Sequence, residues 1–407
     1  MGSWITYDVA NTVFWTGTVG LSFPLWITSS ATSGDDATLG LTLGTTMAVV
    51  MVLSPFLGTL SDQARTRMPF LAATTLVSVA AGLLIGVPGV LGTLILFSLS
   101  LASMELGVIF YNSLLAEVST DANRGRVAGL GVGIGFLGSF IAVGTAFAFA
   151  SYLDEPERYE WTIRVVALLF LVFAVPILFL LKERPRPVAQ SSILTMVASS
   201  WMQLMGDFRS LHRFPGLRIF LTARFLYALA MNTTTAFGVV YASEVLGLSD
   251  REVQLVLLVG ICFAIPSGAF WGRVVDQRGP LIVLGLNVFV WTLVILLALG
   301  ISWFSWSQDL WWVVGCMTGV VMAGVWTADR PLMLRLTPEG YTGEFFGLHS
   351  MIGKVGRVLG PLMWAGMTSL YNQQAAVLCL VIIMASSLPF LSKVPSLVSS
   401  RQKDGPE

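Results

Sequence analysis

Long apolar runs recur from one end of the chain to the other and constrain its fold more than any other feature. A helix that crosses a hydrocarbon core of about 30 Å needs about 20 mostly apolar residues. Only 11% of the 407 residues are charged, whereas soluble proteins carry about 25%. We therefore predict an all-α integral membrane protein with about twelve spanning helices. The predicted spans are 5–29, 38–60, 69–88, 90–115, 127–151, 161–181, 217–242, 252–272, 280–301, 310–334, 345–370 and 374–393.

The placement of Lys and Arg predicts the orientation of these helices. Most of the 23 basic residues fall on one side of the predicted membrane, and only Arg158, Arg164 and Arg251 fall on the other. Cytoplasmic loops are enriched in Lys and Arg. We therefore expect the basic side, with both chain termini, to face the cytoplasm, and the protein to lie in the plasma membrane.

The longest predicted loop, 182–216, divides the chain into two halves. The expected organisation is a six-helix bundle at 1–181, a cytoplasmic linker at 182–216, a second six-helix bundle at 217–393 and a cytoplasmic tail at 394–407. Residues 193–214 place aromatic and methionine side chains at helical spacing, which predicts an amphipathic helix on the membrane surface. A linker without regular structure is the alternative.

The two halves also repeat one another in sequence. GTLSDQ at 58–63 has a counterpart in GRVVDQ at 272–277, and GRVAGL at 125–130 has one in GEFFGL at 343–348. An even number of helices in each half makes the repeat parallel. Parallel halves related by an axis along the membrane normal are typical of the major facilitator fold, in which substrate binds between the halves near mid-membrane.

Several motifs are more specific. They are WITYDVAN at 4–11, GTLSDQARTR at 58–67, FYNSLLAE at 110–117, GEFFGL at 343–348 and GPL at 360–362. Together they resemble the autophagy-related vacuolar amino-acid effluxer family of the major facilitator superfamily, which has many bacterial members of unassigned substrate. The resemblance runs from Trp4 to about Leu370, outside the central loop, and departs from the family at Val9 and Glu117. It implies transport by alternating access without fixing a substrate.

Ionisable residues inside the predicted spans are the first candidates for mechanism. Each costs about 2.5–3.5 kcal/mol at the centre of a bilayer. We therefore expect most of them to be paired, hydrated or close to an interface. The residues are Asp8, Glu105, Arg224, Asp329, Arg330, Lys354 and Arg357.

Glu105 is the predicted proton-coupling residue, because burial raises the proton affinity of a carboxylate. Its span carries no basic residue to accompany it. The alternative is a structural ion pair with a basic residue of another helix. Asp8, close to the inner mouth of the first span with Asn11 and Trp15 nearby, is a second candidate for proton coupling.

The predicted substrate site is rich in cations. Lys354 and Arg357 lie three residues apart, on one helix face near mid-membrane, and suit a carboxylate or phosphate. Pairing with Glu105 or Asp329 is the alternative. Arg224 and Tyr227 share one face of another span, although Arg224 could instead extend toward the cytoplasm. Asn112, Asn11 and Trp15 complete the predicted lining.

Charged loop residues at the cytoplasmic mouth are predicted to gate the transporter. By resemblance, Asp62 helps to hold the inner gate shut while the cavity is open outward, and Asp276 is its weaker counterpart in the second half. The other gating candidates are Arg65, Arg67, Arg124, Asp329 and Arg330. The last two lie near the inner end of their helix, where a packing role is the alternative.

The sequence therefore predicts a monomeric secondary transporter for a small organic solute that bears a carboxylate, with amino acids among the candidates and protons as the coupling ion. We see no nucleophile–base set, metal cluster or phosphate loop, so neither enzyme activity nor a cofactor is expected. The neutral net charge gives no indication of nucleic-acid binding. Efflux of amphipathic drugs or lipids, and a non-transporting receptor or assembly factor, remain as alternatives.

Overall fold

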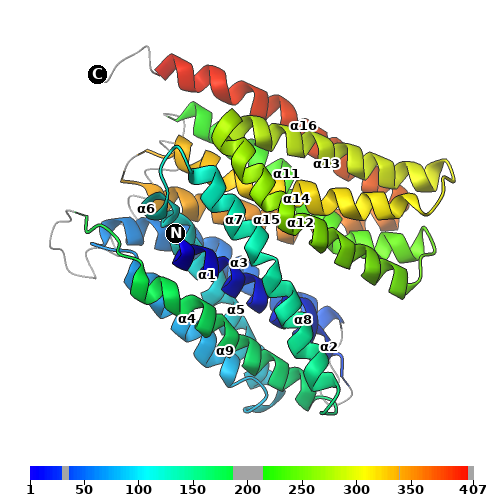
Figure 1. Ribbon diagram of the computed structural model, residues 1–407. Coiled ribbons are helices and arrows are strands. Elements are labelled where there is room, and N and C mark those ends of the chain that lie inside the picture. The colour runs from blue at the N-terminus through cyan, green and yellow to red at the C-terminus, as the bar shows by residue number, and fades with distance from the viewer. Residues whose placement is uncertain (30–35, 187–213, 339, 402–407) are drawn as a thin grey trace. The chain divides into compact units, whose positions relative to one another are not determined.

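The computed structural model describes residues 1–29, 36–186, 214–338 and 340–401. These residues form helices joined by short loops, and no strand occurs among them (Figure 1). Within the same ranges, nine helices are long and apolar enough to cross a membrane. The predicted all-α membrane fold is confirmed.

Three other predicted spans correspond to helices that fall outside these nine. The first is continuous but changes type along its length: α1 (Gly2–Phe14), a π-helical stretch η1 (Trp15–Ser22) and α2 (Phe23–Ile27). The second, α4 (Met68–Leu83), is apolar but has only 16 residues. The third, α15 (Thr342–Leu370), has the length but carries Lys354 and Arg357.

Two compact units account for the fold. The first unit contains the helices that precede α7, the part of the chain from Leu130 through α9, and the short segment Gly340–Gly347. Inside it, α4 packs against α5 and α9, and α1 packs against α9. Its remaining helices are α3 (Asp36–Gln63), α5 (Gly89–Ser113), α6 (Leu115–Val118), α8 (Leu137–Ala150) and α9 (Glu157–Leu180).

The second unit contains α11 to α14, the remainder of α15 from Leu348, α16, and the segment Ala122–Gly129. That segment includes the start of α7 (Arg124–Gly135). In this unit α12 packs against α14, and α11 packs against α16. The helix bounds are α11 (Pro215–Glu244), α12 (Asp250–Arg278), α13 (Pro280–Trp303), α14 (Leu310–Leu336) and α16 (Gln373–Arg401). The predicted amphipathic helix at 193–214 lies almost wholly outside the described residues.

In each unit, apolar and polar side chains are distributed as expected for helices in lipid. Large apolar side chains such as Leu91, Phe147 and Phe179 are exposed, as expected where the surroundings are hydrocarbon. Polar side chains turn inward: the Ser78 hydroxyl donates to the Ser100 carbonyl at 2.9 Å, and the Ser100 hydroxyl returns a bond to the Ser78 carbonyl at 2.7 Å. These reciprocal bonds join α4 to α5, because a polar group in lipid must find its partner within the protein.

Candidate functional site

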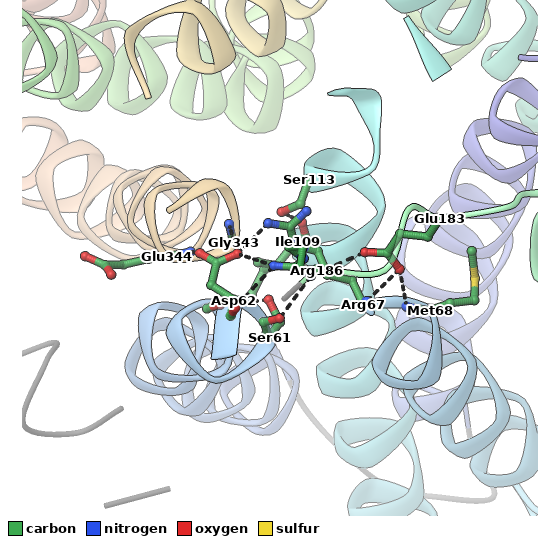
Figure 2. Close-up of polar contacts among 11 residues, drawn as sticks. Ser61, Asp62, Arg67, Met68, Ile109, Ser113, Glu183, Arg186, Gly343 and Glu344 are labelled. Carbon is green, nitrogen blue, oxygen red and sulfur yellow. Dashed lines mark hydrogen bonds and ion pairs between the residues drawn. The ribbon is translucent and has the colours of Figure 1, made fainter. Parts of the chain in front are cut away.

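A network of charged residues surrounds Asp62 at the end of α3, in the first unit (Figure 2). The Asp62 carboxylate accepts hydrogen bonds from the backbone N–H groups of Gly343 at 2.9 Å and Glu344 at 2.8 Å. These two residues begin α15, where N–H groups have no partner within the helix. A carboxylate at this position satisfies them and complements the positive end of the helix dipole.

Close approach of the two backbones makes this contact possible. A Cβ atom on Gly58 would lie 2.2 Å from the Gly343 carbonyl oxygen, and one on Gly343 would lie 2.8 Å from Asp62 Oδ1. Farther along α15, a Cβ on Gly347 would lie 2.5 Å from the Ser54 carbonyl oxygen. Glycine is thus required where α3 meets the start of α15.

The counterpart of Asp62 in the repeat, Asp276, makes the equivalent contact in the second unit. It accepts from the backbone N–H of Gly125 at 2.6 Å and of Arg126 at 3.1 Å, at the start of α7. The Arg126 Nε also donates to it at 3.0 Å. Gly272 takes the role of Gly58, since a Cβ there would lie 2.7 Å from the Gly125 carbonyl oxygen. The two sequence motifs that repeat therefore also make the same pattern of hydrogen bonds in the two units.

The beginning of the central loop completes the Asp62 network. Glu183 Oε2 accepts from the backbone N–H of Arg67 at 2.6 Å and of Met68 at 3.0 Å, and so caps the start of α4. Arg186 donates to Asp62 Oδ1 at 3.2 Å and to the Ser61 carbonyl at 3.2 Å, and its own backbone N–H donates to the Arg65 carbonyl at 3.0 Å.

Two cations therefore flank Asp62. Arg67, buried, forms an ion pair with it, and Arg186 forms the other. Burial lowers the pKa of Arg186, and the nearby Arg67 guanidinium lowers it further, while Asp62 and Glu183 oppose the shift. The sequence analysis missed the roles of Glu183 and Arg186, although the charged run at 182–186 directly after an apolar helix was a usable signal. Of the other predicted gate residues, Arg65 is exposed and contributes its backbone carbonyl, and Arg124 begins α7.

A second network, buried inside the second unit, is centred on Asp329 of α14. Tyr227 Oη donates to Asp329 Oδ1 at 2.6 Å, and His349 Nε2 lies 3.0 Å from Asp329 Oδ2. Arg224 Nη1 donates to the same Oδ2 and forms an ion pair with it. Its Nε donates to the His349 carbonyl at 3.2 Å. We call Arg224, Tyr227, Asp329 and His349 the Asp329 cluster.

The cluster draws on three helices. Arg224 and Tyr227 are three residues apart on one face of α11, Asp329 lies on α14 and His349 on α15. The sequence analysis assigned Asp329 to gating or packing and Arg224 to substrate binding, whereas the structure places them in one ion pair. It missed His349, and the signal was present: His349 is one of only two histidines in the chain and lies within a predicted span.

Other predicted cations lie near the Asp329 cluster on its own helices. Lys354, buried on α15, donates to the Ser350 hydroxyl at 2.5 Å. Arg357, one turn farther along α15, and Arg330 on α14 are partly buried. In the second unit, Arg224 is thus paired with Asp329, while Lys354, Arg357 and Arg330 follow on the helices that carry the cluster.

The predicted polar residues of the first unit lie on α1, η1 and α5. Glu105 and Asn112 are buried on α5, and Asp8 is buried on α1. Asp8 packs against α7, since a Cβ on Gly131 would lie 2.7 Å from its Oδ2. The buried side-chain oxygens of Asn11 and Asn112 have no hydrogen-bond partner among the described residues, so a ligand could use them. Trp15 is half-buried and begins the π-helical stretch.

Metal chemistry has no support in the described ranges, where no group of three or more His, Cys, Asp or Glu side chains is arranged to hold an ion. Cys262, Cys316 and Cys379 are free thiols. These sites can act through charge and hydrogen bonding. Asp62 and Asp276 place carboxylates at helix starts, and Asp329 places one beside the Arg224 guanidinium.

Solved structures with the same fold are transporters of the major facilitator superfamily. A proton:xylose symporter, XylE, superposes with a TM-score of 0.75 over 96% of this chain and 94% of its own, at 10% sequence identity. A bacterial homologue of the iron transporter ferroportin gives 0.75 over 97% and 98%, at 15% identity. The human organic anion transporter MFSD10 gives 0.72 over 96% and 98%, at 13% identity. At these identities the likeness shows the fold.

Sequence comparison identifies the family. An uncharacterized protein of Aquifex aeolicus is 29% identical over 88% of this chain and 86% of its own length. The uncharacterized MFS-type transporter YxiO of Bacillus subtilis is 23% identical over 99% and 97%. Autophagy-related protein 22 of Kluyveromyces lactis is 23% identical over 82% and 68%. The family described as vacuole effluxer Atg22 like matches residues 35–404. The chain therefore belongs to the Atg22-like family and is a membrane transporter of the major facilitator superfamily.

Proposed function

We propose that this transporter moves a small carboxylate-bearing solute across the membrane by alternating access, coupled to protons. The observation that carries the proposal is the Asp329 cluster, in which a partly buried guanidinium is neutralised by a carboxylate of the protein itself. Such a pair is costly to bury, and intramembrane ionisable residues mark substrate and proton pathways. Amino acids are the first class of solute to test.

The cations of the second unit support an anionic solute. Arg224 offers the planar, bidentate geometry that suits a carboxylate. Lys354 and Arg357 follow on α15, near His349 in the chain. Within the first unit, Asn112 and Asn11 have side-chain oxygens with no hydrogen-bond partner among the described residues, which leaves them available to a polar ligand. The organic anion transporter MFSD10 and the proton:xylose symporter XylE show that the fold carries both kinds of cargo in other proteins.

A buried carboxylate must carry the proton, and Glu105 and Asp8 are the candidates in the first unit. We propose that the Asp62 and Asp276 contacts are the gates. Each holds the start of a helix through two backbone N–H groups. Breaking the Asp62 contact would free the start of α15, and breaking the Asp276 contact would free the start of α7. Both helices could then move when the transporter opens at the end where these contacts lie. This side is the cytoplasmic one if the basic loops follow the positive-inside rule, which also places both termini in the cytoplasm.

Uptake into proteoliposomes tests the proposal. We expect ¹⁴C-labelled L-leucine, succinate or benzoate to accumulate when a pH gradient is imposed, and a protonophore to abolish the accumulation. Arg224→Ala, or Lys354→Ala combined with Arg357→Ala, should weaken the apparent affinity. Glu105→Gln should lose gradient dependence if Glu105 carries the proton. Transport of none of the three probes by well-folded protein would count against carboxylate transport.

One observation favours a second candidate, the efflux of amphipathic compounds. A small apolar pocket of about 40 Å³, open to its surroundings, lies inside the second unit and is lined by Tyr241, Trp311, Trp364, Val377 and Leu380, among others. The methyl end of an acyl chain could enter it. Export of a fluorescent amphipathic dye from inverted vesicles, blocked by a large side chain at Gly238 in the pocket wall, would favour this function over carboxylate transport.

A further inference from the structure

We infer that Asp329 is the proton-binding residue and that it takes up its proton together with the binding of a solute carboxylate at Arg224. The inference rests on the proposed function and assigns its coupling site. The sequence pointed to Glu105, on a helix of the other unit, for this role. The Asp329 cluster differs because the Asp329 carboxylate already forms an ion pair with Arg224, the cation that an anionic solute would need to bind.

The hydrogen bonds define the resting state of the cluster. Three donors converge on the carboxylate: Tyr227 on Oδ1, and Arg224 and His349 on Oδ2. A carboxylate that accepts from three donors is held in its ionised form. His349 must then carry a proton on Nε2 in order to donate. With a neutral imidazole, Arg224 and Asp329 balance each other and the buried cluster has no net charge.

Arg224 is the member that a solute can reach. Its side chain is 12% exposed, whereas those of Asp329 and His349 are 7% and 6% exposed. Its Nε and Nη1 are engaged within the cluster. Its Nη2 has no hydrogen-bond partner among the described residues and lies beside Gly353, where a Cβ would approach it to 3.3 Å. A side chain at Gly353 would therefore crowd the Nη2 edge of the guanidinium.

The surrounding charges make Asp329 and a solute carboxylate compete for Arg224. Arg224, Asp329 and Arg330 are among the charged groups that act on His349, and Lys354 and Arg357 follow on α15. On the neighbouring helices, α13 carries no charged residue and those of α12 lie near its two ends. Asp329 is therefore the one acidic group of the described residues that holds Arg224, and a second carboxylate at Arg224 would compete with it directly.

Protonation of Asp329 resolves this competition. The proton adds to Oδ1, and the new O–H can donate to Tyr227 Oη, because a phenol oxygen both donates and accepts. Oδ2 still accepts from His349 Nε2. Arg224 is then an uncompensated buried cation, which a solute carboxylate neutralises. By linkage, a bound carboxylate raises the proton affinity of Asp329 as much as the proton raises the affinity for the carboxylate. The proton and the solute carboxylate therefore bind together.

Proton uptake on binding tests the inference without relying on transport. L-leucine, succinate and benzoate are each added to the purified protein in weakly buffered detergent that contains a pH-sensitive dye. The wild-type protein should take up about one proton per bound probe carboxylate, and its affinity should fall about tenfold per pH unit above the titration range. Asp329→Asn, which imitates the protonated residue, should bind the same probe with no proton uptake and an affinity independent of pH. Glu157→Gln, on an exposed carboxylate, is the matched control and should behave as wild type.

The outcomes separate the inference from the proposed function. Probe binding without proton uptake by the wild-type protein overturns the inference and leaves carboxylate binding intact. The inference is also wrong if Asp329→Asn keeps pH-dependent binding, or if Glu105→Gln alone removes the proton uptake. If the wild-type protein binds none of the probes, the proposed function fails and the inference fails with it. Should Asp329→Asn not fold, Tyr227→Phe, which removes the acceptor for the new O–H, should weaken probe binding at low pH more than at high pH.

Discussion

The contact between Asp62 and the start of α15 can be measured at the two amides that form it. Gly343 and Glu344 each donate a backbone N–H to a separate oxygen of the carboxylate. Amide hydrogen exchange at these residues requires the contact to open, so its rate reports the free energy that keeps it closed. The informative change is Asp62→Asn, which keeps the shape and removes the charge.

The structure sets the expected size of the effect. An asparagine presents one oxygen, so one of the two N–H bonds is lost and the other is no longer charge-assisted. Hydrogen bonds to charged groups contribute about 1.5–3 kcal/mol each and neutral ones about 1 kcal/mol. The contact should therefore weaken by about 2–5 kcal/mol, which corresponds to a roughly 30- to 4,000-fold faster opening-limited exchange at these two amides.

The second unit provides a control within the same molecule. Gly125 and Arg126 donate to Asp276 in the same geometry, so Asp62→Asn should leave exchange at the start of α7 much less affected than at the start of α15. Asp276→Asn should reverse the pattern. Hydrogen exchange followed by mass spectrometry, in nanodiscs, resolves both helix starts. Exchange at Gly343 and Glu344 within about threefold of wild type would refute the assignment of Asp62 as the acceptor that holds α15.

Three further predictions concern stability and the network around Asp62. Gly86→Ala should destabilise the protein by more than the about 1–2 kcal/mol that a left-handed backbone costs, because Gly86 has a φ of +86° and its new Cβ would lie 2.1 Å from Glu160 Oε2. Gly89→Ala is the comparison, since its φ is +75° with nothing within 4 Å, and thermal unfolding should show the smaller loss there. Glu183→Gln should lower stability by about 1–3 kcal/mol, because it weakens the cap on the first N–H groups of α4, and equal melting temperatures would contradict that role. Arg67→Lys should speed exchange at the start of α15, since an ammonium cannot reproduce the guanidinium geometry, and unchanged exchange would show that Arg67 does not support Asp62.

Much of the fold was predictable because a membrane imposes strong local rules. Each predicted span coincides with one helix or with consecutive helical segments, as in α1–η1–α2 and α7–α8, since about 20 apolar residues in lipid must satisfy their backbone bonds internally. Positive φ angles at Gly86 and Gly89 mark the turn that separates the spans predicted at 69–88 and 90–115. The polar character of α15 follows from Lys354 and Arg357 and explains why this helix is not apolar enough to count among the nine spans.

The sequence repeat also corresponds to a repeat of helix caps, which the sequence comparison of the two halves did not predict. The fifth residue of both GTLSDQ and GRVVDQ is an aspartate whose carboxylate caps a helix start, and GRVAGL and GEFFGL provide those starts. The glycines in these motifs could be read as packing residues from sequence alone. The helix start that each aspartate caps could not, because the donors are backbone N–H groups, which have no sequence signature.

The sequence by itself determined the membrane class, the helix positions, the repeat and the set of buried charges. Only the tertiary structure decided how those charges combine. Asp329 meets Arg224 and Tyr227 from about a hundred residues earlier in the chain and His349 from the next helix. Residues so distant in sequence can pair only when packing brings their helices together. Since burial demands a partner without naming it, the sequence could identify the ionisable residues but not their pairing.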